Sequence, residues 1–198
     1  MDPIDKQDRQ HLPDDPFLTN MSWQGVAVDS SGFRVLAYHV RLYELAQAFL
    51  HAAVIICREA GESGEPTWPI GSACYFNLYH STELFLKACI SSRDPGAVRS
   101  IHEVADLRKK YAEMFPGDQY RFNTPWFVSV DEVSQILGHD VFSGVDKKPD
   151  QLYRYSADRS GTASKGIQSF TPGYLFNYMG YLQDRWAALW SSIVPDGG

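Results

Sequence analysis

The sequence predicts an all-α protein, and three observations support this fold class. Apolar residues recur at the three- and four-residue spacing of amphipathic helices over most of the chain. Helix-start signals precede these segments, and proline or glycine residues follow them. The chain has 198 residues, of which 44% are hydrophobic, so it can bury a core within one domain. We therefore expect a compact helical bundle with a small β-hairpin or extended insertion before its last helix.

Residues 1–30 differ from the rest of the chain. They are rich in Asp, Pro, Ser and Gly, and their few apolar residues follow no period, which is typical of an irregular arm. Residues 31–198 are expected to form a single helical domain. Its first helix is predicted over 33–60, because apolar residues repeat there every seven positions in two adjacent seams. The seams are Val35, Leu42, Phe49 and Ile56, and Tyr38, Leu45 and Ala52.

The second helix is predicted over 70–91. Pro69 precedes it, at a position where a first helical turn tolerates proline. Apolar residues lie on nearly every side of this helix, among them Cys74, Leu78 and Phe85. Because a helix that is apolar nearly all round must be buried, we expect this helix at the centre of the bundle.

Two capping boxes predict further helices. In a capping box, a serine oxygen and a glutamate carboxylate each accept a hydrogen bond from an otherwise unpaired backbone amide. The segment from Ser100 to Glu103 has this form ahead of a helix at about 101–115, which Pro116-Gly117 stops. The segment from Ser129 to Glu132 has the same form ahead of a short helix that Gly138 closes.

The C-terminal part of the domain has two patterns. Residues 151–170 contain two short apolar and aromatic stretches around a glycine-containing segment, which predicts a hairpin or a pair of extended loops. The last helix is predicted over 172–194. Thr171 is its N-cap, Pro172 occupies its first turn, and apolar residues keep the helical spacing for five turns.

The charge balance and the cysteines exclude several classes of protein. A formal net charge of -6 argues against a nucleic-acid binder that works through bulk charge. The cysteines Cys57, Cys74 and Cys89 have no disulfide or metal-site spacing, so we expect them to be reduced and buried. No uninterrupted apolar run reaches the ~18 residues of a membrane span, and the first residues lack signal-peptide features. We expect a cytoplasmic protein with no membrane association, metal or cofactor.

A polar strip runs along the predicted second helix. Its members are Asn77, His80, Glu83 and Lys87. At helical spacing these residues fall within about 120° of the circumference. Glu83 and Lys87 are an i,i+4 pair in the favourable order and His80 lies one turn earlier, so a linked network is expected. Two interpretations are open: a structural or solvated network, or the lining of a cleft in which His80 changes charge near neutral pH.

Three segments around this strip match known motifs. The first is residues 78–88 (LYHSTELFLKA), the second is His102 with Leu107 at the start of the next helix, and the third is residues 152–155 (LYRY). In this order they resemble the HEPN (higher eukaryotes and prokaryotes nucleotide-binding) superfamily over about 70–194. The chain departs from the family pattern after His102, where Glu-Val replaces Asp-Leu.

The resemblance implies an up-down bundle of four to five helices that forms a homodimer through its last helices. Many members of the superfamily are metal-independent endoribonucleases that act as toxins, phage-defence effectors or RNA-processing factors. Their nuclease signature is an Arg followed, after four to six residues, by a His near the start of the last helix. The predicted last helix of this chain contains Arg185 and no histidine, so the signature is missing there.

Arg34 and His39 match the signature formally, but on the first predicted helix. A chain with this many arginines and histidines contains roughly one such match by chance. Two residues five apart on a helix also point about 140° away from each other. We therefore interpret Arg34 as a surface residue of the first turn and His39 as a neighbour of the core seam.

Two sets of candidate site residues follow. The catalytic set is His80, Glu83, Lys87 and His102. The RNA-binding set is Arg154, Tyr155, Arg159 and Lys165. The second set lies within 147–165, which has five basic and two acidic side chains, and Arg and Tyr together suit phosphate contact and base stacking. Arg154 has a second interpretation, as a structural partner of Glu83 or of another buried carboxylate.

The leading hypothesis is an RNA-associated, HEPN-like homodimer of bacterial toxin–antitoxin or phage-defence type, without the standard Arg-x(4-6)-His nuclease site. Such a protein would act by binding or assembly, or through a divergent site around His80, Glu83 and Lys87 with His102 and Arg154. One alternative is an active metal-independent endoribonuclease. In that mechanism a His deprotonates the ribose 2′-hydroxyl, and an Arg or Lys stabilises the charge that develops on the phosphate. The other alternative is a non-enzymatic subunit that binds a cognate antitoxin or defence-complex partner through residues 1–30.

Overall fold

The computed structural model describes residues 30–64, 66–98, 100–123 and 170–195. The chain divides into two units, Met1–Arg34 and Val35–Gly198. The described helix of the first unit is α2 (Ser31–Arg34), a single turn with no buried residue. The predicted short helix after Ser129 and all of the predicted hairpin over 151–170 except Phe170 lie outside the described residues.

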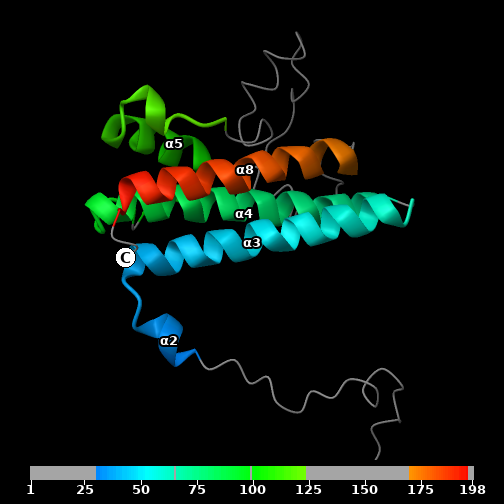
Figure 1. The fold of residues 1–198 in the computed structure, drawn as a ribbon, viewed down its shortest axis with the longest axis horizontal. Coiled ribbons are helices and arrows are strands. Elements are labelled where there is room, and N and C mark those ends of the chain that lie inside the picture. The colour runs from blue at the N-terminus through cyan, green and yellow to red at the C-terminus, as the bar shows by residue number, and fades with distance from the viewer. Residues whose placement is uncertain (1–29, 65, 99, 124–169, 196–198) are drawn as a thin grey trace, which may run out of the picture. The chain divides into compact units, whose positions relative to one another are not determined.

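The second unit is mostly helical in its described residues. No strand occurs among these residues, so the predicted all-α class is confirmed. Its elements are α3 (Tyr38–Glu62), α4 (Trp68–Arg93), α5 (Val104–Met114), the 3-10 turn η1 (Asp118–Tyr120) and α8 (Pro172–Ile193). The three long helices α3, α4 and α8 pack side by side, and α5 lies against α4 (Figure 1).

Contacts at both ends of α3 fix the directions of the long helices. Near the C-terminus of α3, the Cys57 thiol donates a hydrogen bond to the carbonyl of Pro172, at 3.0 Å, where α8 begins. Near the N-terminus of α3, Tyr43 stacks on Trp190, with ring centroids 4.3 Å apart, where α8 ends. Helix α3 is therefore antiparallel to α8. It is also antiparallel to α4, so α4 and α8 run in the same direction (Figure 1).

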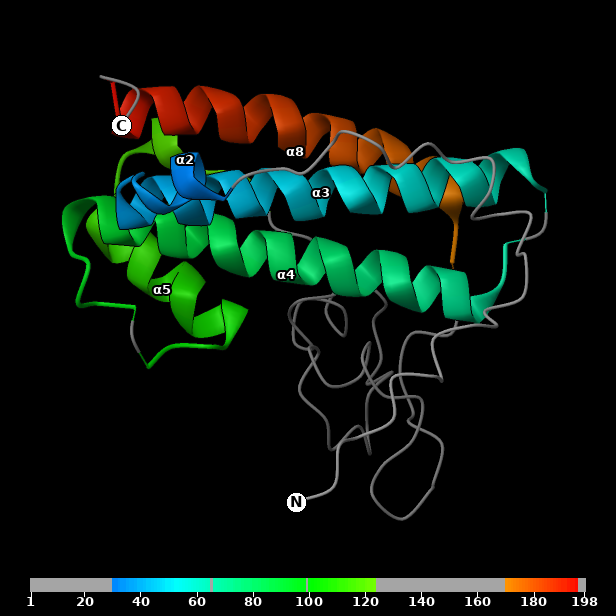
Figure 2. The same ribbon diagram turned by 90° about the horizontal axis from the view of Figure 1, so that it is seen from below.

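Helix α5 begins beside the middle of α4 and ends beside the C-terminus of α4. The Val104 amide donates to the Tyr79 hydroxyl at 3.4 Å, and Arg93 Nη1 donates to the Met114 carbonyl at 2.6 Å. The chain after α4 must therefore turn back along that helix before α5 starts (Figure 2). This return brings His102 next to the polar strip of α4.

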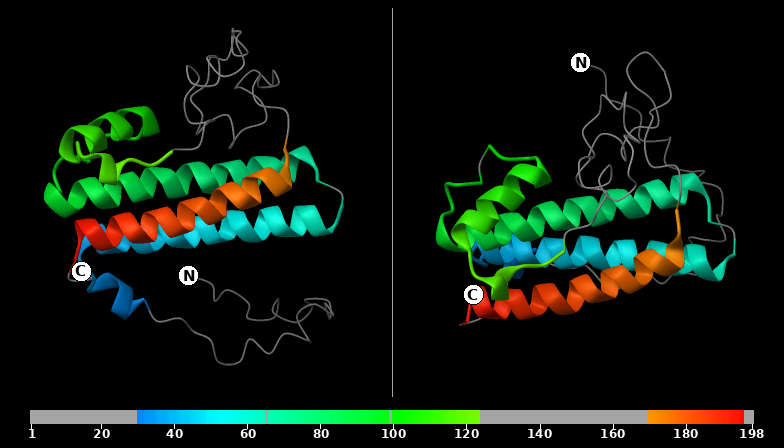
Figure 3. Two further views of the ribbon diagram at one scale, coloured as in Figure 1. Left: turned by 45° about the horizontal axis from the view of Figure 1, so that its top comes forward. Right: turned by 90° about the horizontal axis from the view of Figure 1, so that it is seen from above.

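Helix α4 is the central helix, as its apolar circumference predicts. All residues from Ser81 to Ser91 are buried, including the polar and charged ones. Phe85 shows how it joins the other helices, because its ring stacks on Trp186 of α8 with centroids 4.4 Å apart and also contacts Tyr43 of α3. The views in Figure 3 show α4 lying between α5 and α3.

The predicted seams of the first helix are partly wrong. Val35 is 84% exposed, and Tyr38 and Leu45 are also exposed. The residues of α3 that face the core lie beside the predicted seams: Ala46, Leu50, Ala53, Cys57 and Ala60 are each at most 1% exposed. Small residues allow the backbones of two helices to approach closely, so the larger residues of the heptad pattern are left on the flanks.

Two predicted helix starts are also wrong. The first long helix begins at Tyr38 instead of residue 33, because Ala37 has an extended backbone with ψ of 149°. The third begins at Val104 instead of residue 101, and Glu103 is its N-cap without a side-chain capping hydrogen bond, so the Ser100 capping box does not form. The last helix starts at Pro172 as predicted, although the Thr171 side chain makes no capping hydrogen bond.

Helix α3 has the length and composition of a membrane-spanning helix. Its best 18-residue window has a mean hydropathy of 1.4, and 39% of that window is buried inside the protein. Core helices of soluble proteins satisfy the same criterion. In this chain α3 supplies eight buried residues to the contacts with other helices.

Candidate functional site

The polar strip of α4 forms the linked network that its spacing predicts. Glu83 is at its centre, with its two carboxylate oxygens bound to different partners. Oε2 lies 3.2 Å from His80 Nδ1, one turn earlier in the helix. Oε1 accepts a hydrogen bond of 2.6 Å from Lys87 Nζ, one turn later. Because both neighbours sit at i−3 and i+4 of the same helix, helical geometry alone brings them to the carboxylate.

His102 joins this network from the segment that returns along α4. Its Nδ1 lies 3.7 Å from Glu83 Oε1, and its side chain is 78% exposed. The four residues of the predicted catalytic set therefore come together at one place, which we call the Glu83 cluster. They line a cavity of about 360 Å³, whose other walls are Tyr38, Leu42 and Leu84.

The Glu83 carboxylate is ionised despite its burial. Only 11% of its side chain is exposed. Burial raises the pKa of Glu83, but the hydrogen bonds from His80 and Lys87, together with the charges of these two partners, outweigh burial and hold the pKa below its usual range. The Lys87 side chain is equally buried, so the two charges form a nearly enclosed ion pair.

The imidazole of His80 is held in one orientation. Phe49 of α3 meets it edge-on, with centroids 4.6 Å apart, and Phe76 stacks on it at 5.9 Å. Since the Glu83 carboxylate is an acceptor, Nδ1 of His80 is the nitrogen that carries the proton in this contact. Nε2 is then the nitrogen of neutral His80 that can accept a proton from a ligand.

Two other sequence candidates are separate from the cluster. The Asn77 amide donates to the carbonyl of Ala73 at 2.8 Å, which accounts for this member of the predicted strip. His39 is half-buried and its ring lies 6.0 Å from that of Trp190, beside the core as expected. Neither Asn77 nor His39 lines the cavity of the Glu83 cluster.

The predicted RNA-binding set lies outside the described residues: Arg154, Tyr155, Arg159 and Lys165. Because Arg154 is among these residues, its alternative pairing with Glu83 stays a prediction. Within the described ranges, no group of three or more His, Cys, Asp or Glu residues is placed to hold a metal ion. Cys57, Cys74 and Cys89 are free and buried, as predicted.

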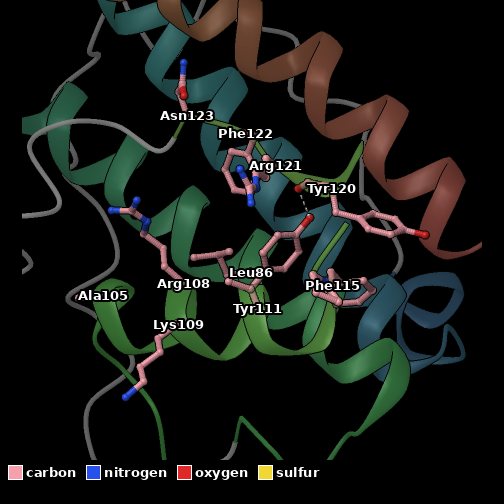
Figure 4. Close-up of a pocket in the computed structure, with 12 residues that line it drawn as sticks. Leu86, Ala105, Arg108, Lys109, Tyr111, Phe115, Tyr120, Arg121, Phe122 and Asn123 are labelled. Carbon is pink, nitrogen blue, oxygen red and sulfur yellow. Dashed lines mark hydrogen bonds between the residues drawn. The ribbon is translucent and has the colours of Figure 1, made fainter. Parts of the chain in front are cut away.

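A second and larger cavity, of about 630 Å³, lies between α5 and the chain that follows it, and no motif in the sequence predicts it (Figure 4). Its lining combines three basic residues with aromatic rings. The relevant signals are the basic run Arg108-Lys109-Lys110 and the aromatic residues of 111–122. These residues line one cavity only because the chain after α5 folds back against that helix.

No protein-family model, curated protein or solved structure matches this chain. The resemblance to the HEPN superfamily therefore stays a prediction from the three motifs.

Proposed function

We propose that this chain is an RNA-associated, HEPN-like protein of bacterial toxin–antitoxin or phage-defence type, and that the Glu83 cluster is a divergent, metal-independent site for RNA cleavage. One observation carries the proposal. Two imidazoles, a carboxylate and an ammonium group line a single cavity of about 360 Å³. These are the groups that acid–base cleavage of a phosphodiester requires.

The proposed reaction uses the 2′-hydroxyl of RNA as its nucleophile. Neutral His80 takes the 2′-hydroxyl proton at Nε2, and the bond from the 2′-oxygen to phosphorus forms as the bond from phosphorus to the 5′-oxygen breaks. Protonated His102 gives its proton to the departing 5′-oxygen. The products are a 2′,3′-cyclic phosphate and a 5′-hydroxyl, so no metal or external nucleophile is needed.

Glu83 and Lys87 have supporting parts in this mechanism. The carboxylate orients His80 and stabilises the imidazolium that forms when His80 accepts a proton, as a carboxylate does in other catalytic pairs. Lys87 has three N–H donors, of which Glu83 engages one. The remaining donors can bind a non-bridging phosphate oxygen, where negative charge develops.

Cleavage of a short, labelled single-stranded RNA in excess chelator tests the proposal. We expect cleavage by the wild-type chain, and no cleavage of the same sequence made with 2′-deoxy nucleotides. His80→Ala and His102→Ala should each lower the rate by about 10²- to 10⁴-fold, the usual contribution of a general acid or base. His51→Ala is the matched control, because His51 is an exposed histidine of α3 that does not line the cavity.

Three outcomes contradict this assignment. RNA bound without cleavage indicates association without catalysis. Loss of cleavage in His39→Ala alone moves the active site to the Arg34 and His39 match. Neither cleavage nor RNA binding favours the alternative of a non-enzymatic, partner-binding subunit.

A further inference from the structure

The second cavity is a separate site. It lies between α5 and the segment that contains η1, with Leu86 of α4 at its base (Figure 4). None of its described lining residues also lines the cavity of the Glu83 cluster. Its volume of about 630 Å³ falls in the range of small-molecule sites, roughly 300–1,000 Å³. Its lining is Leu86, Ala105, Arg108, Lys109, Tyr111, Ala112, Phe115, Pro116, Tyr120, Arg121, Phe122 and Asn123.

The charged residues of this lining, among those that the structure describes, are all basic. Arg108 and Lys109 come from α5, Arg121 follows η1, and none of the described lining residues is a carboxylate. The Nε of Arg121 lies 3.1 Å from Asp118 Oδ1, but both side chains are more than three-quarters exposed. Such a surface pair is weak, so an anion can replace the carboxylate. The cavity therefore has the electrostatics of an anion site.

Aromatic rings form the apolar part of the lining. Tyr111 packs against Phe115 and Phe122, with centroids 5.0 and 5.8 Å away. Phe122 also packs edge-on against Phe85 and Trp186 of the core. The rings are consequently fixed from behind. Tyr111 and Phe115 are buried, so the half-buried Phe122 is the ring of this group that offers a rigid surface to a flat apolar group.

Hydrogen bonds hold the far wall of the cavity in place. Arg185 of α8 donates to the carbonyls of Gln119 and Arg121, at distances of 2.6 to 3.1 Å. The Tyr178 hydroxyl donates to the carbonyl of Asn123 at 2.6 Å. The Tyr111 hydroxyl crosses from α5 to the Tyr120 carbonyl at 2.8 Å. The wall is thus formed before any ligand arrives, which lowers the entropic cost of binding.

We propose that this cavity binds a nucleoside phosphate, with the phosphate on Arg108 and Arg121 and the base or ribose against the aromatic wall. Arginine suits phosphate because its planar guanidinium group presents several N–H donors to the phosphate oxygens. In Figure 4 the side chains of Arg108 and Lys109 leave α5 in different directions, and of these two only Arg108 is assigned to the phosphate. The same chemistry is present in a free nucleotide and in one nucleotide unit of single-stranded RNA. The assignment does not depend on cleavage at the Glu83 cluster.

Titration of the full chain with AMP, adenosine and a short single-stranded RNA tests this site. We expect AMP to bind and adenosine, which lacks the phosphate, to bind at least tenfold more weakly. Arg108→Ala and Arg121→Ala should each weaken AMP binding by about tenfold, the effect of one lost charged hydrogen bond. Lys110→Ala is the control. Lys110 lies next to the site on α5 but does not line it, and its Nζ lies 3.9 Å from Glu113 Oε2.

The RNA titration identifies the source of the nucleotide. Tighter binding of RNA than of AMP, with a salt dependence that falls by roughly 0.7 in log–log slope in Arg121→Ala, assigns an RNA chain to the cavity. Tighter binding of AMP assigns a free nucleotide. The proposal is overturned if neither probe binds, if both arginine variants bind AMP like the wild type, or if Lys110→Ala loses as much affinity as they do. Circular dichroism of each variant confirms that the fold is intact.

Discussion

The two cavities both border α5 or the chain leading into it, but they differ in charge. At the Glu83 cluster, the carboxylate contacts Lys87 and two histidines, so charges of both signs are present. Among its described residues, the lining of the second cavity has three basic side chains and no carboxylate. A mixed set of ionisable groups suits the movement of protons, whereas an excess of positive charge suits the holding of an anion.

They differ also in the burial of their ion pairs. The side chains of Glu83 and Lys87 are each 11% exposed, whereas those of Arg121 and Asp118 are 77% and 87% exposed. A buried charge that loses its partner is strongly destabilising, and an exposed one is solvated by water. The same pairing of acid and base should therefore affect folding at the first cavity and leave it unchanged at the second.

The largest effect on stability is expected for Glu83→Ala. This variant leaves the Lys87 ammonium buried without its partner, so the free energy of unfolding should fall by about 3–5 kcal/mol. Urea denaturation of the variant and the wild type measures the change. Glu83→Ala combined with Lys87→Met removes both charges and should recover much of the loss. A loss below about 1 kcal/mol in Glu83→Ala would contradict the buried ion pair.

The acid sensitivity of the fold should depend on the same carboxylate. The pKa of Glu83 in the folded chain lies below the ordinary value of 4.5, so ionised Glu83 stabilises the fold above that pH. This contribution is lost as the pH falls through the folded-state pKa. Below about pH 4.5 the stability difference between wild type and Glu83→Gln should therefore shrink as the pH falls. A difference that keeps growing below that pH has the wrong sign for this account.

A smaller effect is expected for Arg185→Ala, at the wall of the second cavity. The variant loses three hydrogen bonds to the backbone of 119–121, which should lower the free energy of unfolding by about 1–2 kcal/mol. It should also weaken AMP binding several-fold, although Arg185 does not line the cavity. Asp184→Ala is the control, since Asp184 is its exposed neighbour in α8. Unchanged AMP affinity in Arg185→Ala would mean that the wall needs no such support.

The smallest effect is expected for Asp118→Ala. Its pair with Arg121 is exposed, so stability should stay within about 0.5 kcal/mol of the wild type. AMP should bind more tightly, because the carboxylate no longer competes for Arg121. Urea denaturation and AMP titration measure these changes. Weaker AMP binding in this variant would show that Asp118 orients Arg121 for the ligand.

The first site is largely predictable from the sequence, since its central contacts are local. His80, Glu83 and Lys87 follow one another at i, i+3 and i+7 of one helix, so helical geometry is sufficient to join them. The motif around His102 predicts that this residue joins them, and the return of the chain before α5 explains how it reaches them.

The second site and the packing of α3 were not predictable in the same way. The second cavity requires α5, the chain after η1 and α8 to meet, and residue spacing carries no information about such a meeting. In α3 the heptad pattern predicts the helix but places its seam on the flank. The residues that are buried in the core are the small Ala46 and Ala53, whereas the larger Leu45 is exposed. The capping box at Ser100 fails because the helix begins three residues later than it indicates.

The most direct test of the account is a crossed measurement on two variants, His80→Ala and Arg121→Ala. Each is assayed for RNA cleavage at saturating RNA in chelator and for AMP affinity. The account predicts that His80→Ala loses cleavage and keeps AMP affinity, and that Arg121→Ala keeps the cleavage rate and loses AMP affinity. Loss of both properties in both variants, or of neither, would contradict the existence of two sites with different chemistry.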